Sequence, residues 1–326
     1  MKVLLTVDTE LWPLSPGWPV QPLPADKTDF SDEFAMYIDG ATSSGSFGLK
    51  YQLGLLERYR LRSTWFIEPL FSERAGQALL RNIVDQIVSR SQEVGLHLHT
   101  EWLGETRLAG LPQSYRQFLR QFSVAEQGAL IAWGRQRLLD AGARRVDVFR
   151  AGSFGANLDT IKALEAVGIR QDSSFNPSIP VSFPDLEMPR AEAIQPFFIG
   201  AVREFPVATF RTLREPDRNA QICACSASEL EHALLGAHAA KWEVFVIFWH
   251  SGELVRRERP NRQYAIHVSR FEALCKLLDR HRDIFETVHF ADLASLPLTG
   301  ASPLPVRVPY GATARRLVEQ IASRAL

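Results

Sequence analysis

Short apolar runs that end at an ionisable side chain recur along this chain, and segments with the spacing of amphipathic helices separate them. The most apolar run, residues 244–250, reads Val-Phe-Val-Ile-Phe-Trp-His, and residues 2–8 follow the same plan. Unbroken apolar runs of this length are typical of strands that are buried on both faces. Because such strands alternate with helices, the sequence predicts a parallel sheet with right-handed crossovers, either open or closed into a barrel.

The same patterns give the expected order of elements. Strands are expected at 2–7, 61–67, 94–97, 146–150, 169–172, 221–225, 244–250 and 287–290. Helices are expected at 47–59, 73–90, 113–141, 158–167, 228–240, 267–281 and 312–324.

Two stretches do not fit this alternation. Residues 11–46 contain five prolines within their first 14 positions and predict a long irregular insertion. Loops of this length in compact domains are usually functional, so we expect the insertion to lie over the active-site mouth as a lid or rim. Residues 300–311 are expected to form an extended tail before the last helix. The expected organisation is one barrel domain at 1–299 and a C-terminal tail with a short helix at 300–326.

Length and charge exclude several classes of protein. The 326 residues are enough for one large α/β barrel. The 37 basic side chains balance 37 acidic ones, so no overall field favours nucleic acid or an anionic membrane. The sequence has no apolar run long enough to span a bilayer, and its first apolar run is too short for a signal-peptide core. We therefore expect a cytoplasmic protein with no nucleic-acid partner and no membrane insertion.

The polar side chains that end the expected strands are potential site residues. They are Asp8 and Glu10, Glu68, His97 with His99 and Glu101, Arg150, Asp172, and His250. In parallel α/β architectures the carboxyl ends of the strands are where active sites are built. Each residue taken singly could be an ordinary polar strand terminus, but a whole set of this kind indicates a site.

The segment 93–102, Glu-Val-Gly-Leu-His-Leu-His-Thr-Glu-Trp, is the strongest local signal. In an extended backbone alternate side chains share a face, so His97, His99 and Glu101 would project together. Imidazole is the commonest ligand for zinc-like ions, and the spacing therefore predicts metal ligands. The alternative is that both histidines are partly buried, hydrogen-bonded residues at a strand end.

Five short motifs, in order along residues 1 to about 295, resemble those of the NodB-homology polysaccharide deacetylases, carbohydrate esterase family 4. They are Thr6-Val-Asp8-Thr-Glu10, Glu93-Val-Gly-Leu-His97-Leu-His99-Thr-Glu101, Arg150-Ala-Gly152-Ser-Phe-Gly155, Asp172-Ser-Ser and Phe248-Trp-His250-Ser. The resemblance implies an irregular (β/α) barrel of about seven parallel strands. It also implies a metal-dependent hydrolase that cleaves a linear amide, removing the N-acetyl group of an acetamido sugar or oligosaccharide in surface polysaccharide or glycoconjugate synthesis.

The resemblance also implies roles for single residues. It assigns Asp8 as the catalytic base, and Glu10 and His97 as metal ligands. The second motif departs from the family pattern His-x-x-x-His, because its second position is Glu101 and His99 is additional. We expect Glu10, His97 and His99 to hold one divalent ion, with zinc as the expected metal. The rival assignment has Glu101 bound and His99 turned away.

The remaining chemistry needs an acid for the leaving amine and a group that orients the base. His250 is the candidate acid because the pKa of histidine lies near operating pH. Arg150 would keep Asp8 ionised through a charge-assisted hydrogen bond. No serine or cysteine nucleophile beside a base is evident, so we expect direct attack by water. Further contacts to the substrate or to the metal ligands are expected from Glu68, Glu101, Trp102 and Asp172.

Two other functions remain open on the sequence. A glycoside hydrolase could use a pair of carboxylates drawn from Asp8, Glu10, Glu68 and Glu101, and removal of metal would then leave activity intact. Alternatively, the barrel could be a catalytically silent carbohydrate-binding protein. Its binding would then depend on the aromatic side chains Trp12, Trp18, Trp102 and Phe154.

Overall fold

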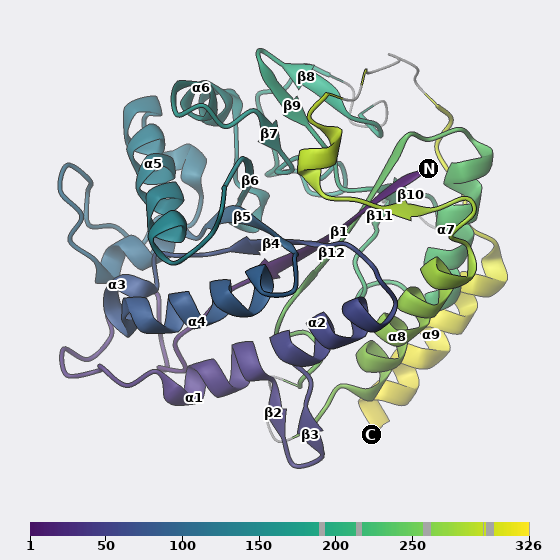
Figure 1. The fold of residues 1–326 in the computed structure, drawn as a ribbon, viewed down its shortest axis with the longest axis horizontal. Coiled ribbons are helices and arrows are strands. Elements are labelled where there is room, and N and C mark those ends of the chain that lie inside the picture. The colour runs from purple at the N-terminus through teal and green to yellow at the C-terminus, as the bar shows by residue number, and fades with distance from the viewer. Residues whose placement is uncertain (189–192, 213–216, 257–261, 296, 298–302, 326) are drawn as a thin grey trace.

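The computed structural model describes residues 1–326 except 189–192, 213–216, 257–261, 296, 298–302 and 326. Its centre is a curled sheet in the strand order β12-β1-β4-β5-β6-β7-β9-β8 (Figure 1). Seven of these strands run parallel, and only β8 pairs antiparallel, with β9. The parallel sheet is therefore as the sequence predicts.

The strands of this sheet are short. They span Lys2–Thr9 (β1), Thr64–Ile67 (β4), Glu93–Leu98 (β5), Val148–Ala151 (β6), Gln171–Asp172 (β7), Phe197–Ile199 (β8), Val202–Glu204 (β9) and Val244–His250 (β12), and Glu286–Thr287 (β13) pairs with β1.

Helices cover the outside of the sheet (Figure 1). The α-helices span Leu49–Arg58 (α2), Ser72–Ala75 (α3), Gln77–Val88 (α4), Val124–Asp140 (α5), Leu158–Ala166 (α6), Ala227–Ala239 (α7), Ala265–Arg280 (α8) and Tyr310–Ala325 (α9). Short 3₁₀ turns span Thr100–Glu105 (η2), Leu119–Gln121 (η3), Gly152–Phe154 (η4) and Phe290–Leu293 (η5). Capping boxes begin α5, α6 and α7, so polar side chains satisfy the free amides of their first turns.

Irregular backbone joins the two ends of the curled sheet. After β9 the amide of Val207 donates to the carbonyl of Phe175, and the amide of Ala208 donates to Val246 of β12 at 3.1 Å. A small antiparallel pair, Thr209–Phe210 (β10) with Arg218–Asn219 (β11), follows.

The expected strand at 221–225 is wrong. Only Gln221 forms a bridge, to Phe248, and the following residues turn, because α7 starts just beyond them.

Alternate residues of each strand enter two different layers. One apolar cluster contains strand residues such as Val3 and Leu5 together with helix residues such as Leu53, so it fills the space between sheet and helices. The other contains no residue of an α-helix and therefore fills the inside of the curl. Its members are Leu4, Phe66, Val148, Phe205, Val244, Val246, Val288, Phe290 and Leu293.

The inner face carries the candidate site, because side chains alternate between faces along a strand. Asp8 lies on the face of Leu4, Arg150 on the face of Val148, and His250 on the face of Val246. These polar residues follow the inner apolar residues toward the carboxyl ends of their strands. The parallel register then sets Asp8 beside His250 and His97 beside Arg150.

Gly95 lets the strands approach on this inner face. A Cβ atom at Gly95 would lie 2.7 Å from the ring of Phe66 and 3.1 Å from Val148. Because Gly95 has no side chain, the rings and methyl groups of the inner apolar cluster fit against its backbone, two residues before His97.

The insertion 11–46 is less irregular than expected. It contains the helix Ser31–Phe34 (α1), the π-helix Ala35–Asp39 (η1) and a hairpin of Ala41–Thr42 (β2) with Gly45–Ser46 (β3). Its first part is without regular structure and brings Trp12 to the cavity described below.

The expected domain boundary at 299/300 lies outside the described residues. Beyond it, α9 packs on α7, where Arg316 and Glu229 form a buried ion pair at 3.1 Å. Among the described residues, no helix is both long and apolar enough to cross a membrane.

Candidate active site and metal-ligand cluster

A cavity of about 390 Å³ lies where the carboxyl ends of β1, β5, β6 and β12 meet. Its lining residues are Asp8, Glu10, Trp12, His97, His99, Ala151, Ser153, Phe154, His250 and Glu253. Small-molecule sites begin at about 300 Å³, so the cavity is large enough for a sugar-sized ligand. The structure therefore brings five of the predicted residues, namely Asp8, Glu10, His97, His99 and His250, to one cavity.

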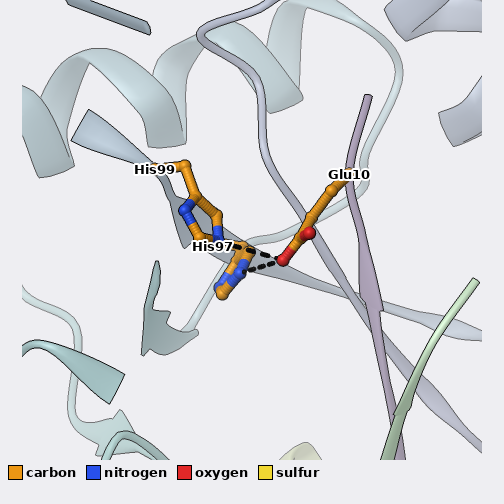
Figure 2. Close-up of side chains that lie close together, drawn as sticks. All are labelled: Glu10, His97 and His99. Carbon is orange, nitrogen blue, oxygen red and sulfur yellow. Dashed lines mark hydrogen bonds and ion pairs between the residues drawn. The ribbon is translucent and has the colours of Figure 1, made fainter. Parts of the chain in front are cut away.

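Glu10, His97 and His99 form the core of this cavity (Figure 2). Oε1 of Glu10 lies 3.0 Å from Nε2 of His97 and 2.9 Å from Nε2 of His99. All three side chains are buried, and their nearest ligand atoms lie within 4.8 Å of one another. Among the described residues no other group of histidine, cysteine and acidic side chains meets this geometry.

The partners of the two Nδ1 atoms determine which nitrogen of each neutral ring carries the proton. Nδ1 of His97 lies 2.8 Å from the carbonyl of Arg150, which can only accept, so this nitrogen carries a proton. Nδ1 of His99 faces a carboxylate oxygen of Glu101 at 3.4 Å. In the neutral rings both Nε2 atoms therefore turn lone pairs toward Glu10. Two imidazole nitrogens and one carboxylate oxygen are a ligand set suited to a zinc-like ion.

The electrostatics of the cluster favour a bound positive charge. Burial raises the pKa of Glu10, but the neighbouring histidines outweigh it and lower the pKa well below its usual value. Burial lowers the pKa of His99, whereas Glu10 and Glu101 raise it well above the usual value. The second oxygen of Glu10 accepts from Nε1 of Trp12 at 2.6 Å, which leaves the first oxygen to face both rings.

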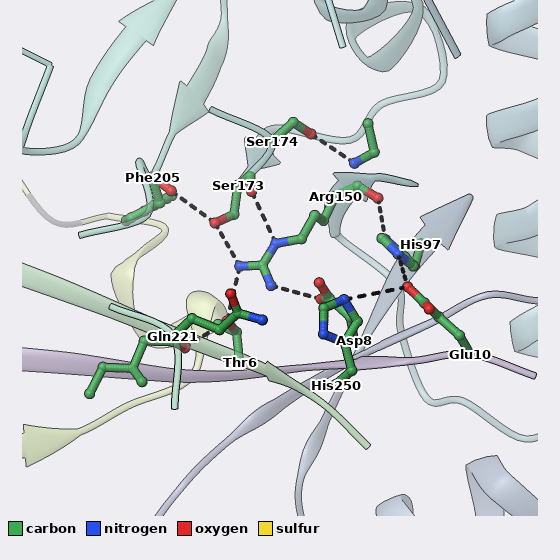
Figure 3. A network of polar contacts seen from close by, with 12 residues as sticks. Thr6, Asp8, Glu10, His97, Arg150, Ser173, Ser174, Phe205, Gln221 and His250 are labelled. Carbon is green, nitrogen blue, oxygen red and sulfur yellow. Dashed lines mark hydrogen bonds and ion pairs between the residues drawn. The ribbon is translucent and has the colours of Figure 1, made fainter. Parts of the chain in front are cut away.

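Asp8 and Arg150 form a buried ion pair beside the cluster (Figure 3). Nη1 of Arg150 donates to Oδ1 of Asp8 at 2.7 Å, and Nη2 donates to Thr6 at 2.9 Å. Nε donates to the carbonyl of Ser173 at 3.0 Å. The guanidinium also lies 4.3 Å from the ring centre of Phe66. Arg150 is thus fixed on several sides and orients the Asp8 side chain at the cavity wall.

His250 is held by Glu253, a residue that the sequence reasoning missed. Its Nδ1 lies 2.5 Å from Oε1 of Glu253, and that oxygen also accepts from the Gln221 amide at 2.7 Å. Burial lowers the pKa of His250, but Glu253 and then Glu10 raise it, giving a value of about 9. The ring is therefore protonated at neutral pH and presents Nε2–H to the cavity. The spacing of His and Glu, three residues apart after a strand, was the available signal.

The turn after β6 forms part of the cavity wall. Ser153 and Phe154 both have positive φ, at 51° and 54°, which is uncommon for residues other than glycine. A Cβ atom at Gly152 would lie 2.5 Å from the Leu98 carbonyl and 2.9 Å from the His99 ring. The turn thus passes directly against the metal-ligand strand and brings Ser153 and Phe154 to the cavity.

None of the four predicted further contacts to substrate or ligands lines the cavity, and three of them lie close around it. Glu101 lies in the 3₁₀ turn η2, so the strand alternation stops at His99 and its carboxylate returns to the His99 ring. Trp102 is buried and packs against Trp18, with ring centres 5.2 Å apart. Both oxygens of Glu68 accept backbone amides, from Leu70 and Phe71, and burial raises its pKa to about 8. These side chains support the structure around the cavity.

Asp172 faces away from the cavity because of its register. It pairs with Phe149, whose side chain belongs to the layer between sheet and helices, and it stands beside Glu204 of β9. Burial raises the pKa of both acids, and the neighbouring Asp172 carboxyl raises the pKa of Glu204 further. Among the described residues, Oδ2 of Asp172 and Oε2 of Glu204 have no hydrogen-bond partner. We expect the pair to hold one proton between these oxygens, which would give both of them a partner.

Two solved structures share this fold over most or all of the chain. A Mycobacterium smegmatis protein provisionally named polysaccharide deacetylase superimposes with a TM-score of 0.55 at 17% identity, over 90% of this chain and 88% of that one. A 4-alpha-glucanotransferase from Thermococcus litoralis superimposes with a TM-score of 0.56 at 11% identity, over 100% of this chain and 46% of that one. This chain has the deacetylase-type (β/α) barrel fold.

The fold by itself does not identify the reaction, because a deacetylase-like protein and a glucanotransferase both have it. No family model matches the sequence, and no curated protein matches it. Only the side chains of the cavity can therefore indicate the reaction.

The Asp172–Glu204 pair makes stability depend on pH. Its raised folded-state pKa values mean that the folded chain keeps a proton that the unfolded chain releases above about pH 4, so stability falls as pH rises from there toward the folded-state values. In Glu204→Gln the side-chain amide can donate a hydrogen bond to Asp172, so the pair no longer needs to keep a bound proton. We expect the variant to gain on the order of 1 kcal/mol relative to the natural chain between pH 5 and pH 8. Urea unfolding at both pH values measures this difference, and a constant difference would contradict the shared proton.

The Glu253 carboxylate should hold His250 protonated. In metal-free protein we expect the His250 ring to titrate near pH 9, and in Glu253→Gln the pKa should move down by about one unit or more because the partner charge is lost. NMR titration of the histidine Cε1–H signals measures both values. An unchanged pKa in the variant would show that Glu253 does not act on the ring.

Proposed function

We propose that this chain is a metal-dependent hydrolase that removes the N-acetyl group from an acetamido sugar or oligosaccharide, within surface polysaccharide or glycoconjugate synthesis. The observation that carries the proposal is the order of groups around one cavity. A cluster of Glu10, His97 and His99 that is suited to bind a cation lies beside an arginine-paired carboxylate and a protonated histidine. Amide hydrolysis by water needs these three functions together.

Glu10, His97 and His99 would hold the divalent ion, with zinc as the expected metal. When bound there, the ion supplies Lewis acidity toward the amide oxygen and toward water. The protein groups behind the ligands keep them oriented. The Arg150 carbonyl and Glu101 accept the outer N–H of the two rings, and Trp12 donates to Glu10.

Asp8 acts as the base. Its carboxylate is fixed by Arg150 and lies at the cavity wall, where it takes a proton from the attacking water. Arg150 makes no hydrogen bond to the ligand cluster through its side chain, so its role toward the reaction is to orient and charge-balance Asp8.

His250 acts as the acid. Its Nδ1–H is committed to Glu253, and Nε2 lies on the cavity side, 3.9 Å from Oε1 of Glu10. In the protonated ring Nε2–H is free to donate to the nitrogen of the leaving amine as the amide C–N bond breaks. Asp8 and His250 stand side by side on β1 and β12, so base and acid flank one reacting centre.

The arrangement does not suit a glycoside hydrolase. Such an enzyme needs one carboxylic acid that stays protonated beside one carboxylate. In the cavity, Asp8 is paired with Arg150, and the pKa values of Glu10 and Glu253 are lowered by histidines. Glu68 has a raised pKa but is bonded to backbone amides and does not line the cavity.

Metal analysis and acetate release test the proposal. Protein purified without chelator should carry about one zinc-like ion per chain and release acetate from a panel of N-acetylated sugars and oligosaccharides. His97→Ala should lose both metal and activity. Asp8→Asn should keep the metal and lose activity by about 10²- to 10⁴-fold, because only the base is neutralised.

The exposed His232 of α7 provides the matched control, since His232→Ala should change neither measurement. Loss of the ion in Asp8→Asn as complete as in His97→Ala would make Asp8 a ligand instead of the base. Full acetate release by metal-free protein would contradict the metal dependence, and cleavage of glycosidic bonds by metal-free protein without acetate release would restore the glycoside hydrolase. Tight sugar binding without any turnover would favour the silent carbohydrate-binding barrel.

The third ligand can be tested separately. We expect His99→Ala to weaken zinc affinity by at least about 100-fold, because it removes a nitrogen that faces Glu10. Glu101→Gln should weaken it by about tenfold or less, since the amide oxygen can still accept from the His99 ring. Competition with a chromogenic chelator measures both affinities. A large loss confined to Glu101→Gln would support the rival assignment.

A further inference from the structure

A second cavity, of about 310 Å³, lies at the opposite end of the sheet from the candidate active site. Its lining residues lie where β6, β7 and β9 begin and on the edge strand β8. Its lining residues are Arg145, Asp147, Gly168, Arg170, Gln171, Phe198, Ala201, Arg203, Ala291 and Ala294. The wall therefore carries three guanidinium groups against one carboxylate.

Arg203 is the unusual member of this set. It is only 7% exposed, yet among the described residues no carboxylate lies within ion-pair distance of it. Its guanidinium donates to the backbone carbonyl of Leu293 and lies over the ring of Phe198, 5.0 Å from the ring centre. Burying a cation is costly unless an anion compensates it. Arg203 also lines the cavity, so an anion bound there would compensate its charge.

The nearby acids are already occupied. Asp147 pairs with Arg135 at 3.2 Å, outside the set of lining arginines. Glu165 accepts the backbone amide of Ala201. Arg145 lies 3.6 Å from Glu93, and among the described residues Arg170 bonds only to the backbone carbonyl of Glu165. Positive charge at this cavity is therefore in excess.

We propose that this cavity binds a phosphate group. Guanidinium groups match phosphate oxygens through paired hydrogen bonds, and three of them around one space favour a multiply charged tetrahedral anion over a single carboxylate. Phe198, 55% exposed beside Arg203, offers an apolar surface to a ring attached to that phosphate. The ligand is either free phosphate or the phosphate ester of a ring compound. This site is independent of the proposed hydrolytic function.

Calorimetric titration of the full chain at constant ionic strength, with inorganic phosphate and with uridine monophosphate as probes, tests the site. We expect saturable binding of at least one probe with a dissociation constant below about 1 mM. Arg170→Gln and Arg203→Met should each weaken it by about tenfold or more, the effect of losing one charge-assisted hydrogen bond. Arg170 is exposed, so its variant stays informative should Arg203→Met not fold.

The control is Arg81→Gln, which removes an exposed arginine of α4 outside the cavity and should bind like the natural chain. Tighter binding of the nucleotide, lost in Phe198→Ala, would identify a phosphate ester. Equal binding of both probes would identify free phosphate. Absence of saturable binding, or an equal loss in Arg81→Gln, would overturn the proposal.

Discussion

The buried guanidinium of Arg150 is the interaction on which the site depends. It is fully buried, and its bonds reach Asp8 and Thr6 on one strand and Ser173 after another, while its flat face lies over Phe66. A buried charge that loses its partner is strongly destabilising, so any slip of β6 against these strands would carry a large cost. The same residue accepts the His97 N–H at its carbonyl. One residue thus orients the proposed base through its side chain and a proposed metal ligand through its backbone.

The apolar runs allowed the parallel sheet, most strands and the polar residues at their ends to be predicted from the sequence. They did not give the face on which each polar residue lies, because face depends on register and register is set between distant segments. Asp8 and Asp172 have the same sequence context, each at the end of a buried run. Yet Asp8 continues the inner face of Leu4, whereas Asp172 is in register with the outward Phe149 and ends in a carboxyl pair with Glu204.

Residues beyond the strand ends were harder to predict for a related reason. Once a strand ends, the alternation of faces no longer holds, and turns decide where side chains point. Glu101 follows His99 by two residues but lies in a 3₁₀ turn, so it backs the ring instead of joining it. Glu253 follows β12 through a turn and meets His250 and Gln221, the latter 32 residues away in the chain. The strand expected at 221–225 is wrong for the same reason, because a turn follows Gln221 and, among residues 221–225, only Gln221 pairs with a strand.

The point at which β5 stops being extended also accounts for the departure of this chain from the His-x-x-x-His pattern of the family it resembles. A second ligand four residues on requires the backbone to curl within one turn, whereas a ligand two residues on requires only that it stay extended. His99 does stay extended, with φ −102° and ψ 100°, and the curl begins at Thr100. The adjoining turn leaves space for this, because Gly152 has no side chain against Leu98 and the His99 ring. Strand length, more than the identity of the second ligand, therefore decides which spacing can supply a nitrogen to the cluster. In this chain the strand geometry runs one residue past β5, far enough for His99 and too short for Glu101.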